Sequence, residues 1–96
     1  MHKALLLLRN IPKGKVVTYK ELARAAGTSP RAAGRILARN PDLKTCPCYK
    51  VVASNGELRG YSGPGGLAGK KKLLEKDGVA LKNGRVVPDS FFTFPE

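Results

Sequence analysis

Apolar positions recur at helical spacing in three stretches near the start of the chain. The first stretch runs from Lys3 to Arg9, and Pro12 cannot continue it as a helix. The second runs from about Tyr19 to Ala26, and the third runs from Pro30 to Arg39. We therefore predict three short helices, and the tight turn between the last two is typical of a helix-turn-helix.

Residues that favour helix ends flank the second and third stretches. Thr18 and Glu21 have the spacing of a capping box, in which each side chain bonds a free amide of the first turn. Gly27 is typical of the residue that follows a helix. For the third helix, the corresponding signals are a cap at Thr28 or Ser29 and a break at Asn40-Pro41.

Further along, short β-branched runs alternate with Asn-Gly pairs, which are typical of hairpin turns. Residues 51–53 and 57–59 flank Asn55-Gly56 and predict a first hairpin. A second hairpin is predicted from residues 79–81 and 86–87, which flank Asn83-Gly84.

A fourth helix is expected between the hairpins, from Leu67 to Lys76, after a glycine-rich loop over residues 60–66. Its leucines Leu67, Leu73 and Leu74 are expected to face inward and Lys70, Lys71 and Lys72 outward. The tail from Pro88 carries Phe91, Phe92 and Phe94, which we expect to anchor it on the core. The whole pattern predicts one α+β domain over residues 1–96, mainly helical, with a winged-helix-like helix-turn-helix and short β-hairpins.

Composition narrows the function. A net charge of +11 on 96 residues favours a polyanionic partner, and nucleic acid is the main candidate. The longest aliphatic block, Leu5 to Leu8, is far too short to cross a bilayer, and the N-terminus lacks an export signal. We expect an intracellular, cytoplasmic protein that does not bind membranes.

The chain offers few metal ligands. Cys46 and Cys48 are one residue apart, a poor spacing for an unstrained disulfide, and His2 is the single histidine. We therefore expect no metal and no cofactor.

The third helix carries a basic face. Arg31, Arg35 and Arg39 recur every four residues and share one side of the helix. The small residues between them, Ala32, Ala33 and Gly34, would let the backbone press against a DNA groove. The alternative is an ordinary solvated basic face on an alanine-rich helix.

Cys48 is the candidate nucleophile. It follows Pro47 and precedes Tyr49, Lys50 and the strand that starts at Val51. A nearby cation favours the ionised thiol. The alternative is a small buried hydrophobic residue.

Several motifs, in order and with matching spacing, resemble the C-terminal domain of the O6-alkylguanine-DNA alkyltransferases. The resemblance covers nearly the whole chain to about Gly78. The motifs are Val17-Thr18-Tyr19, Arg31-Ala32-Ala33-Gly34, Arg39-Asn40-Pro41, Pro47-Cys48-Tyr49-Lys50-Val51-Val52, Tyr61-Ser62-Gly63 and Gly66-Leu67.

The resemblance implies a single-turnover reaction in which the thiolate at Cys48 takes the alkyl group from guanine O6 irreversibly. It implies that Arg31 replaces the extruded base in the stack and that Tyr19 assists rotation and donates a proton. Asn40 would brace the active-site turn. The implied pocket consists of Val51, Tyr61, Ser62 and Gly63. The expected partner is double-stranded DNA that carries O6-alkylguanine, and the expected state is a monomer.

The sequence departs from the family's pattern beside the nucleophile. Tyr49 stands where the family has a histidine linked through water to a glutamate, and Asp77 is the nearest match to that acid. A phenol is a weaker proton acceptor than an imidazole at neutral pH. Our hypothesis is that Lys50, a helix terminus or Tyr49 as a hydrogen-bond donor stabilises the thiolate instead.

Two other functions stay open. The first is an alkyltransferase-like protein, which binds and flags alkylated guanine without transfer, although that group usually replaces the cysteine. The second is a plain helix-turn-helix regulator with Cys48 as core filler. The combination of Tyr19, Asn40, Cys48 and Tyr61 favours the transferase over both.

Overall fold

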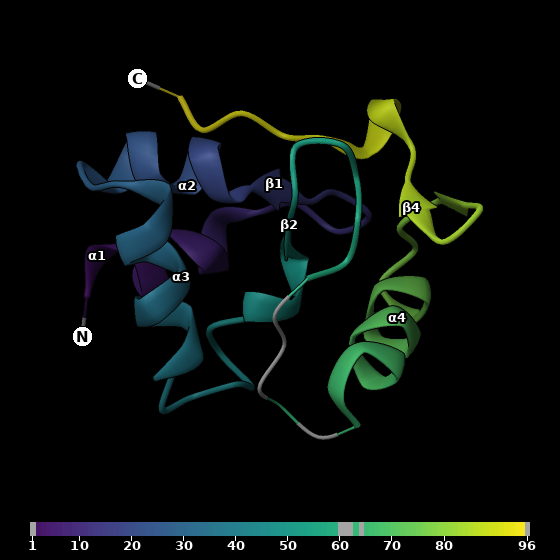
Figure 1. Ribbon diagram of the computed structural model, residues 1–96, viewed down its shortest axis with the longest axis horizontal. Coiled ribbons are helices and arrows are strands. Elements are labelled where there is room, and N and C mark those ends of the chain that lie inside the picture. The colour runs from purple at the N-terminus through teal and green to yellow at the C-terminus, as the bar shows by residue number, and fades with distance from the viewer. Residues whose placement is uncertain (1, 60–62, 64, 96) are drawn as a thin grey trace.

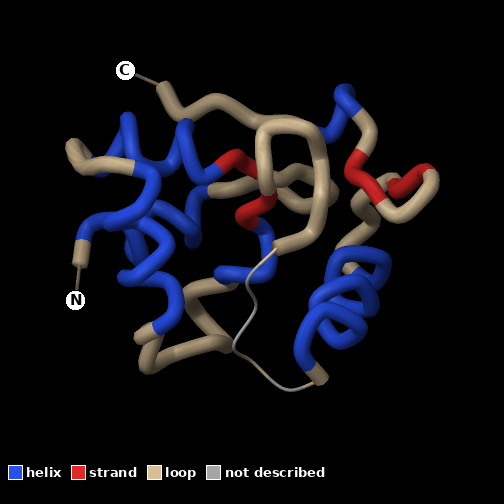
Figure 2. Tube along the Cα trace, in the orientation of Figure 1, coloured by secondary structure: helices blue, strands red, loops and turns tan. Residues whose placement is uncertain are grey.

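A computed structural model describes residues 2–59, 63 and 65–95 of the chain. Figures 1 and 2 show two helical regions with the short strands β1 (Val17–Thr18) and β2 (Val51–Val52) between them. Helices α1 (Lys3–Leu7), α2 (Tyr19–Ala26) and α3 (Pro30–Ala38) form one region, and α4 (Gly66–Lys76) lies on the other side. The α+β fold with a helix-turn-helix is confirmed.

The ends of α2 follow the predicted signals only in part. Thr18 Oγ1 accepts a hydrogen bond from the Glu21 amide at 2.9 Å, and Gly27 ends the helix at a φ of 73°. The reciprocal half of the capping box is wrong. The Glu21 carboxylate turns outward to Arg24 and accepts from the Phe94 amide at 2.8 Å, because the C-terminal tail offers it a donor.

Helix α3 begins as predicted. Ser29 caps it, accepting from the Ala32 amide at 3.1 Å, and Pro30 occupies its first position, where the missing N–H costs nothing. Its apolar side packs on α1 and α2. The buried residues of this packing are Ala4, Leu5, Leu8, Leu22, Ala23, Ala33 and Leu37.

The first predicted hairpin is wrong. Strand β2 (Val51–Val52) pairs in parallel with β1 (Val17–Thr18), in the register Val17 opposite Val51. The Asn55-Gly56 turn does form, with the Ala53 amide 3.0 Å from the Glu57 carbonyl oxygen, but Glu57 then bridges Arg85. Both residues of β2 are completely buried, which is typical of a parallel pair rather than a two-faced hairpin.

The second hairpin is confirmed. Strand β3 (Leu81–Lys82) pairs antiparallel with β4 (Arg85–Val86). Asn83 and Gly84 form the turn at φ values of 54° and 76°, as the two-residue hairpin loop requires.

The C-terminal tail crosses the molecule above β1 after the short 3-10 turn Pro88–Ser90 (Figure 1). The Val16 amide donates to the Ser90 carbonyl oxygen at 2.8 Å, and the Phe92 amide donates to the Val16 carbonyl oxygen at 2.7 Å. Phe94 is buried, and its ring meets Phe92 edge to face at 5.4 Å. Anchoring of the tail by phenylalanines is thus confirmed.

The expected orientation of helix α4 is wrong for Leu67 and Lys70. Lys70 is 1% exposed, whereas Leu67 is 52% exposed. Lys70 lies one turn before the buried Leu74, so the two side chains share the inner face.

Candidate active site and nucleic-acid interface

Cys48 begins a 3-10 turn, Cys48–Lys50, that leads directly into β2. The Cys48 amide bonds the Cys46 carbonyl oxygen at 2.8 Å across Pro47, so the chain reverses tightly just before the thiol. Both cysteines are free thiols, and Cys48 is 6% exposed. The candidate nucleophile is therefore held on a short, fixed turn next to the core.

Asn40 ties this turn to the end of α3. Its Nδ2 donates to the Cys46 carbonyl oxygen at 2.7 Å, and its Oδ1 accepts from the Asp42 amide at 2.9 Å. Burial raises the pKa of the Cys48 thiol, while a hydrogen bond from Asn40 and the charge of Lys70 act in the opposite direction. The resting protein thus keeps the thiol protonated at neutral pH.

Tyr19 is the first residue of α2 and lies near the thiol. Its hydroxyl donates to the Arg59 carbonyl oxygen at 2.8 Å. Burial raises the pKa of Tyr19, the charge of Cys48 adds to this effect, and Arg59 opposes it. The phenol therefore keeps its proton and can act as a donor.

Lys50 and Asp77 form a buried ion pair. Lys50 Nζ lies 2.9 Å from Asp77 Oδ2 and donates to the Pro12 carbonyl oxygen at 2.8 Å. The same carboxylate oxygen accepts from the Gly14 amide at 3.0 Å. Lys50 therefore joins the turn after Pro12 to the end of α4.

Tyr49 is half-buried and packs against the smaller of two hydrophobic clusters, formed around Val16, Val52 and Leu74. It lines a cavity of about 870 Å³ together with Asp77. Tyr49 and Asp77, which match the family's histidine and acid positions, thus line the same cavity. The other residues that line it are Lys13, Leu43, Lys44, Gly69, Lys72, Leu73 and Lys76.

Lys70 is the site residue that sequence reasoning missed. Its Nζ donates to the carbonyl oxygens of Val51 at 2.7 Å and Arg59 at 2.6 Å, and lies 6.0 Å from the centroid of the Tyr19 ring. Burial lowers its pKa to about 8, and the charge of Cys48 opposes that shift. The signal that reveals it is the four-residue spacing to Leu74, which the run of three lysines obscures.

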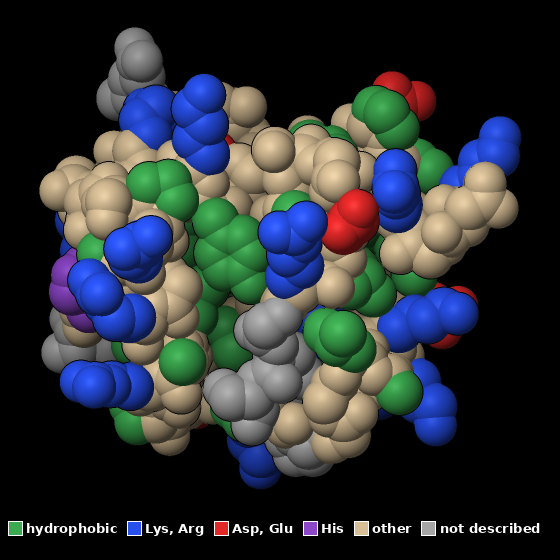
Figure 3. All heavy atoms as spheres, viewed as in Figure 1, with side chains coloured by type: hydrophobic (Ala, Val, Ile, Leu, Met, Phe, Trp, Pro, Cys, Tyr) green, Lys and Arg blue, Asp and Glu red, His purple; other side chains and the backbone are tan. Residues whose placement is uncertain are grey.

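The basic face of α3 is formed as predicted. Arg31, Arg35 and Arg39 are exposed, and a shallow groove of about 370 Å³ runs beside Arg35 and Arg39 to His2. Figure 3 shows Lys and Arg side chains gathered beside the histidine. Ala33 is buried in the core and so cannot touch DNA directly.

The remaining residues of the predicted interface and pocket differ in how exposed they are. Ala32 is half-buried, and a side chain added at Gly34 would meet no atom within 4 Å, so this side of α3 is open. Val51 is fully buried beside Cys48, and Gly63 is half-buried. Tyr61 and Ser62 lie outside the described residues.

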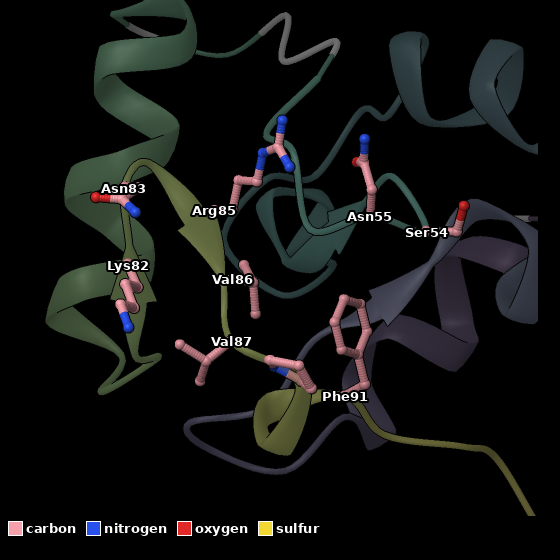
Figure 4. A pocket seen from close by; sticks show the side chains of 9 residues that line it. Ser54, Asn55, Lys82, Asn83, Arg85, Val86, Val87 and Phe91 are labelled. Carbon is pink, nitrogen blue, oxygen red and sulfur yellow. The ribbon is translucent and has the colours of Figure 1, made fainter.

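A separate cavity of about 660 Å³ lies away from the thiol. Figure 4 shows it between the turn that carries Ser54 and Asn55 and the β3–β4 hairpin, with Phe91 on one side. None of the predicted site residues lines it.

Within residues 2–59, 63 and 65–95, no three His, Cys, Asp or Glu side chains are grouped to hold a metal ion. In the same part of the chain, no helix has the length and apolarity needed to cross a membrane.

The sequence matches one protein family over residues 1–79, described as 6-O-methylguanine DNA methyltransferase, DNA binding domain. A methylated-DNA–protein-cysteine methyltransferase from Metallosphaera sedula is 52% identical over 75 residues, which are 78% of this chain and 46% of the relative. The chain spans about half the length of such curated relatives.

Solved structures of similar proteins share the fold. The O6-methylguanine-DNA methyltransferase of the archaeon Pyrococcus kodakaraensis matches with a TM-score of 0.72 and 45% identity, covering 80% of this chain and 44% of that one. S. pombe Atl1, in complex with damaged DNA containing O6-carboxymethylguanine, matches with a TM-score of 0.81 and 25% identity. That match covers 95% of this chain and 92% of the Atl1 chain.

Proposed function

Because the chain belongs to the 6-O-methylguanine DNA methyltransferase family, we propose that it removes the alkyl group from O6 of guanine in duplex DNA and keeps it on Cys48. The observation that carries this proposal is a free thiol held on a rigid turn beside a protonated phenol and a buried ammonium. An inert core cysteine needs neither polar neighbour.

The proposed reaction is a single displacement. The Cys48 thiolate attacks the alkyl carbon, so an S–C bond forms while the C–O6 bond breaks and its electron pair passes to the guanine. Tyr19, whose pKa is raised by burial, donates a proton to the departing base. The product is a thioether, and each chain reacts once.

In this proposal, DNA binds to the basic face of α3, which carries Arg31, Arg35 and Arg39. Arg31 is exposed near the start of α3 and fills the space that the rotated nucleotide leaves. Replacement of Arg31 by alanine should slow repair of duplex DNA far more than reaction with free O6-benzylguanine. Equal losses for both substrates would contradict this role.

Intact-mass spectrometry tests the transfer. Incubation with a duplex that carries O6-methylguanine should add one methyl group, and peptide mapping should locate it on Cys48. The Cys48→Ala variant should bind the same duplex and gain no mass. A wild-type chain that binds the lesion without gaining mass would contradict transfer.

The alternative is a lesion-binding protein that does not transfer. It is supported by the match to S. pombe Atl1, whose structure is in complex with damaged DNA containing O6-carboxymethylguanine. The retained cysteine favours transfer. The mass measurement separates the two, and a protein without preference for the lesion would instead be a general DNA-binding regulator.

A further inference from the structure

Lys70 is a buried ammonium without an acidic partner among the described residues. It is 1% exposed, and its Nζ donates to the carbonyl oxygens of Val51 and Arg59. The ion pairs found in the described part of the chain all involve other cations. A buried charge without a counter-ion is costly, and such groups are concentrated at functional sites.

The ammonium lies within electrostatic reach of Cys48. Helix α4 packs on the 3-10 turn that begins with Cys48, and the Val51 carbonyl that accepts from Lys70 lies three residues after the thiol. Lys70 and Cys48 each favour the charged form of the other. Tyr19 lies against both, since its ring faces Nζ and its pKa responds to Cys48.

The groups that act on this thiol come from four segments. Lys70 comes from α4, Tyr19 from α2, Asn40 from the end of α3, and Cys46 from the turn itself. Lys70 is the one cation whose charge acts on Cys48 among the described residues. The ammonium of Lys50 is engaged by Asp77 and by backbone carbonyls instead.

We propose that Lys70 is the positive partner of the Cys48 thiolate. This inference rests on the proposed function. Before attack, the thiol proton leaves to solvent or to a neutral Lys70 amine, and the reactive state is thiolate beside ammonium. After transfer, the sulfur is a neutral thioether, so Lys70 loses the negative charge that favoured its protonation.

The rate at which iodoacetamide alkylates Cys48, followed from pH 6 to pH 10 by peptide mapping, tests the pairing without DNA. Lys70→Met removes a charge that lowers the thiol pKa, so the rise in rate should move to higher pH. At pH 7 the rate should fall by about threefold to tenfold. Both cysteines lie on one peptide, so its fragment ions are used to assign the alkyl group to Cys48 rather than to Cys46, which is completely buried.

Lys71→Met is the matched control, since Lys71 is the next residue of α4 and is exposed. It removes the same charge from the surface, where solvent screens it, so the profile should stay where it is. An equal shift in both variants, or none in Lys70→Met, would overturn the pairing.

A second measurement needs no change at Lys70. The Nζ of Lys70 should titrate at lower pH in Cys48→Ser than in the wild type, as followed by NMR of the lysine Cε and Nζ nuclei. An unchanged titration would overturn the pairing. If both tests support the pairing but the wild-type protein gains no methyl group from DNA, the proposed function fails and the pairing stands. If the wild-type protein gains the methyl group but both tests contradict the pairing, only the role of Lys70 fails.

Discussion

Lys50 and Lys70 are both buried, but their ammonium groups have different polar partners. Lys50 is 3% exposed and sits in an ion pair with Asp77. Lys70 is 1% exposed and has two backbone carbonyls instead of a carboxylate, and its pKa falls to about 8. An ion pair compensates the burial of charge, whereas carbonyl oxygens do so only in part. We therefore infer that Lys50 stabilises the fold, whereas Lys70 acts on the proposed active site.

The ion pair of Lys50 also bears on Asp77 and Tyr49, the residues that match the family's acid and histidine. Asp77 matches the acid of the resemblance, but its carboxylate bonds Lys50 and the Gly14 amide. Tyr49 lines a cavity beside Asp77 and packs against apolar residues. We therefore expect ionisation of the Cys48 thiol to depend on the charge of Lys70.

The largest expected effect is on stability at the Lys50 site. Lys50→Met leaves the Asp77 carboxylate without its counter-ion in a mostly buried position. We expect a loss of about 3 kcal/mol in the free energy of unfolding, measured with urea at pH 7. Adding Asp77→Asn removes the orphaned charge and should restore part of the loss. A loss below about 1 kcal/mol would contradict the stabilising role of the Lys50–Asp77 ion pair.

Lys70→Met should behave in the opposite way, because it leaves no carboxylate unpaired. The folded-state pKa of Lys70 lies near 8, below the 10.5 of an ordinary lysine, so the folded protein releases this proton first. The burial cost is therefore complete below pH 8 and disappears as the pH rises towards 10.5. Lys70→Met removes this cost but also two hydrogen bonds to backbone carbonyls, so we expect its stability relative to the wild type to be about 2 kcal/mol more favourable at pH 7 than at pH 10.5.

The pH dependence of this difference is the control. The stability of Lys70→Met relative to the wild type should fall steadily between pH 8 and pH 10.5, because Lys70 of the wild type loses its proton over this range. Cys48 and Tyr19 titrate in both proteins, so their contributions largely cancel in the difference. A difference that stays constant over this range would mean that Lys70 carries no shifted pKa.

A smaller effect is expected for Asn40→Ala. The variant removes the bond from Nδ2 to the Cys46 carbonyl and the side-chain bond that lowers the pKa of Cys48. Stability should fall by about 1 kcal/mol, and alkylation of Cys48 should need slightly higher pH than in the wild type. Loss of stability with an unchanged pH profile would restrict Asn40 to bracing the turn.

Much of the fold follows from local signals. Thr18, Gly27 and Pro30 have short-range preferences that fix the ends of α2 and α3, and Asn83-Gly84 favours one turn geometry wherever it occurs. The first hairpin was wrong because the partner of β2 is β1, which lies more than 30 residues earlier in the chain. No local pattern distinguishes that partner from a neighbouring strand.

The candidate site, like the fold, could be predicted from the sequence only in part. Cys48 was predicted from its neighbours in the sequence, and Asn40 and Tyr19 from the resemblance to the alkyltransferases. The structure places Asn40 and Tyr19 close to Cys48. Lys70 was missed because its role depends on α4 packing against the active-site turn, and composition alone suggests a solvated lysine. The structure thus adds the burial of this charge and its lack of an acidic partner among the described residues.

The most direct test is the pH profile of methyl transfer from O6-methylguanine DNA to Cys48, measured under single-turnover conditions by intact mass. Wild-type protein should gain one methyl, Lys70→Met should gain it more slowly at pH 7 with its profile moved to higher pH, and Lys71→Met should match the wild type. No methyl on wild-type Cys48 at any pH would contradict the account.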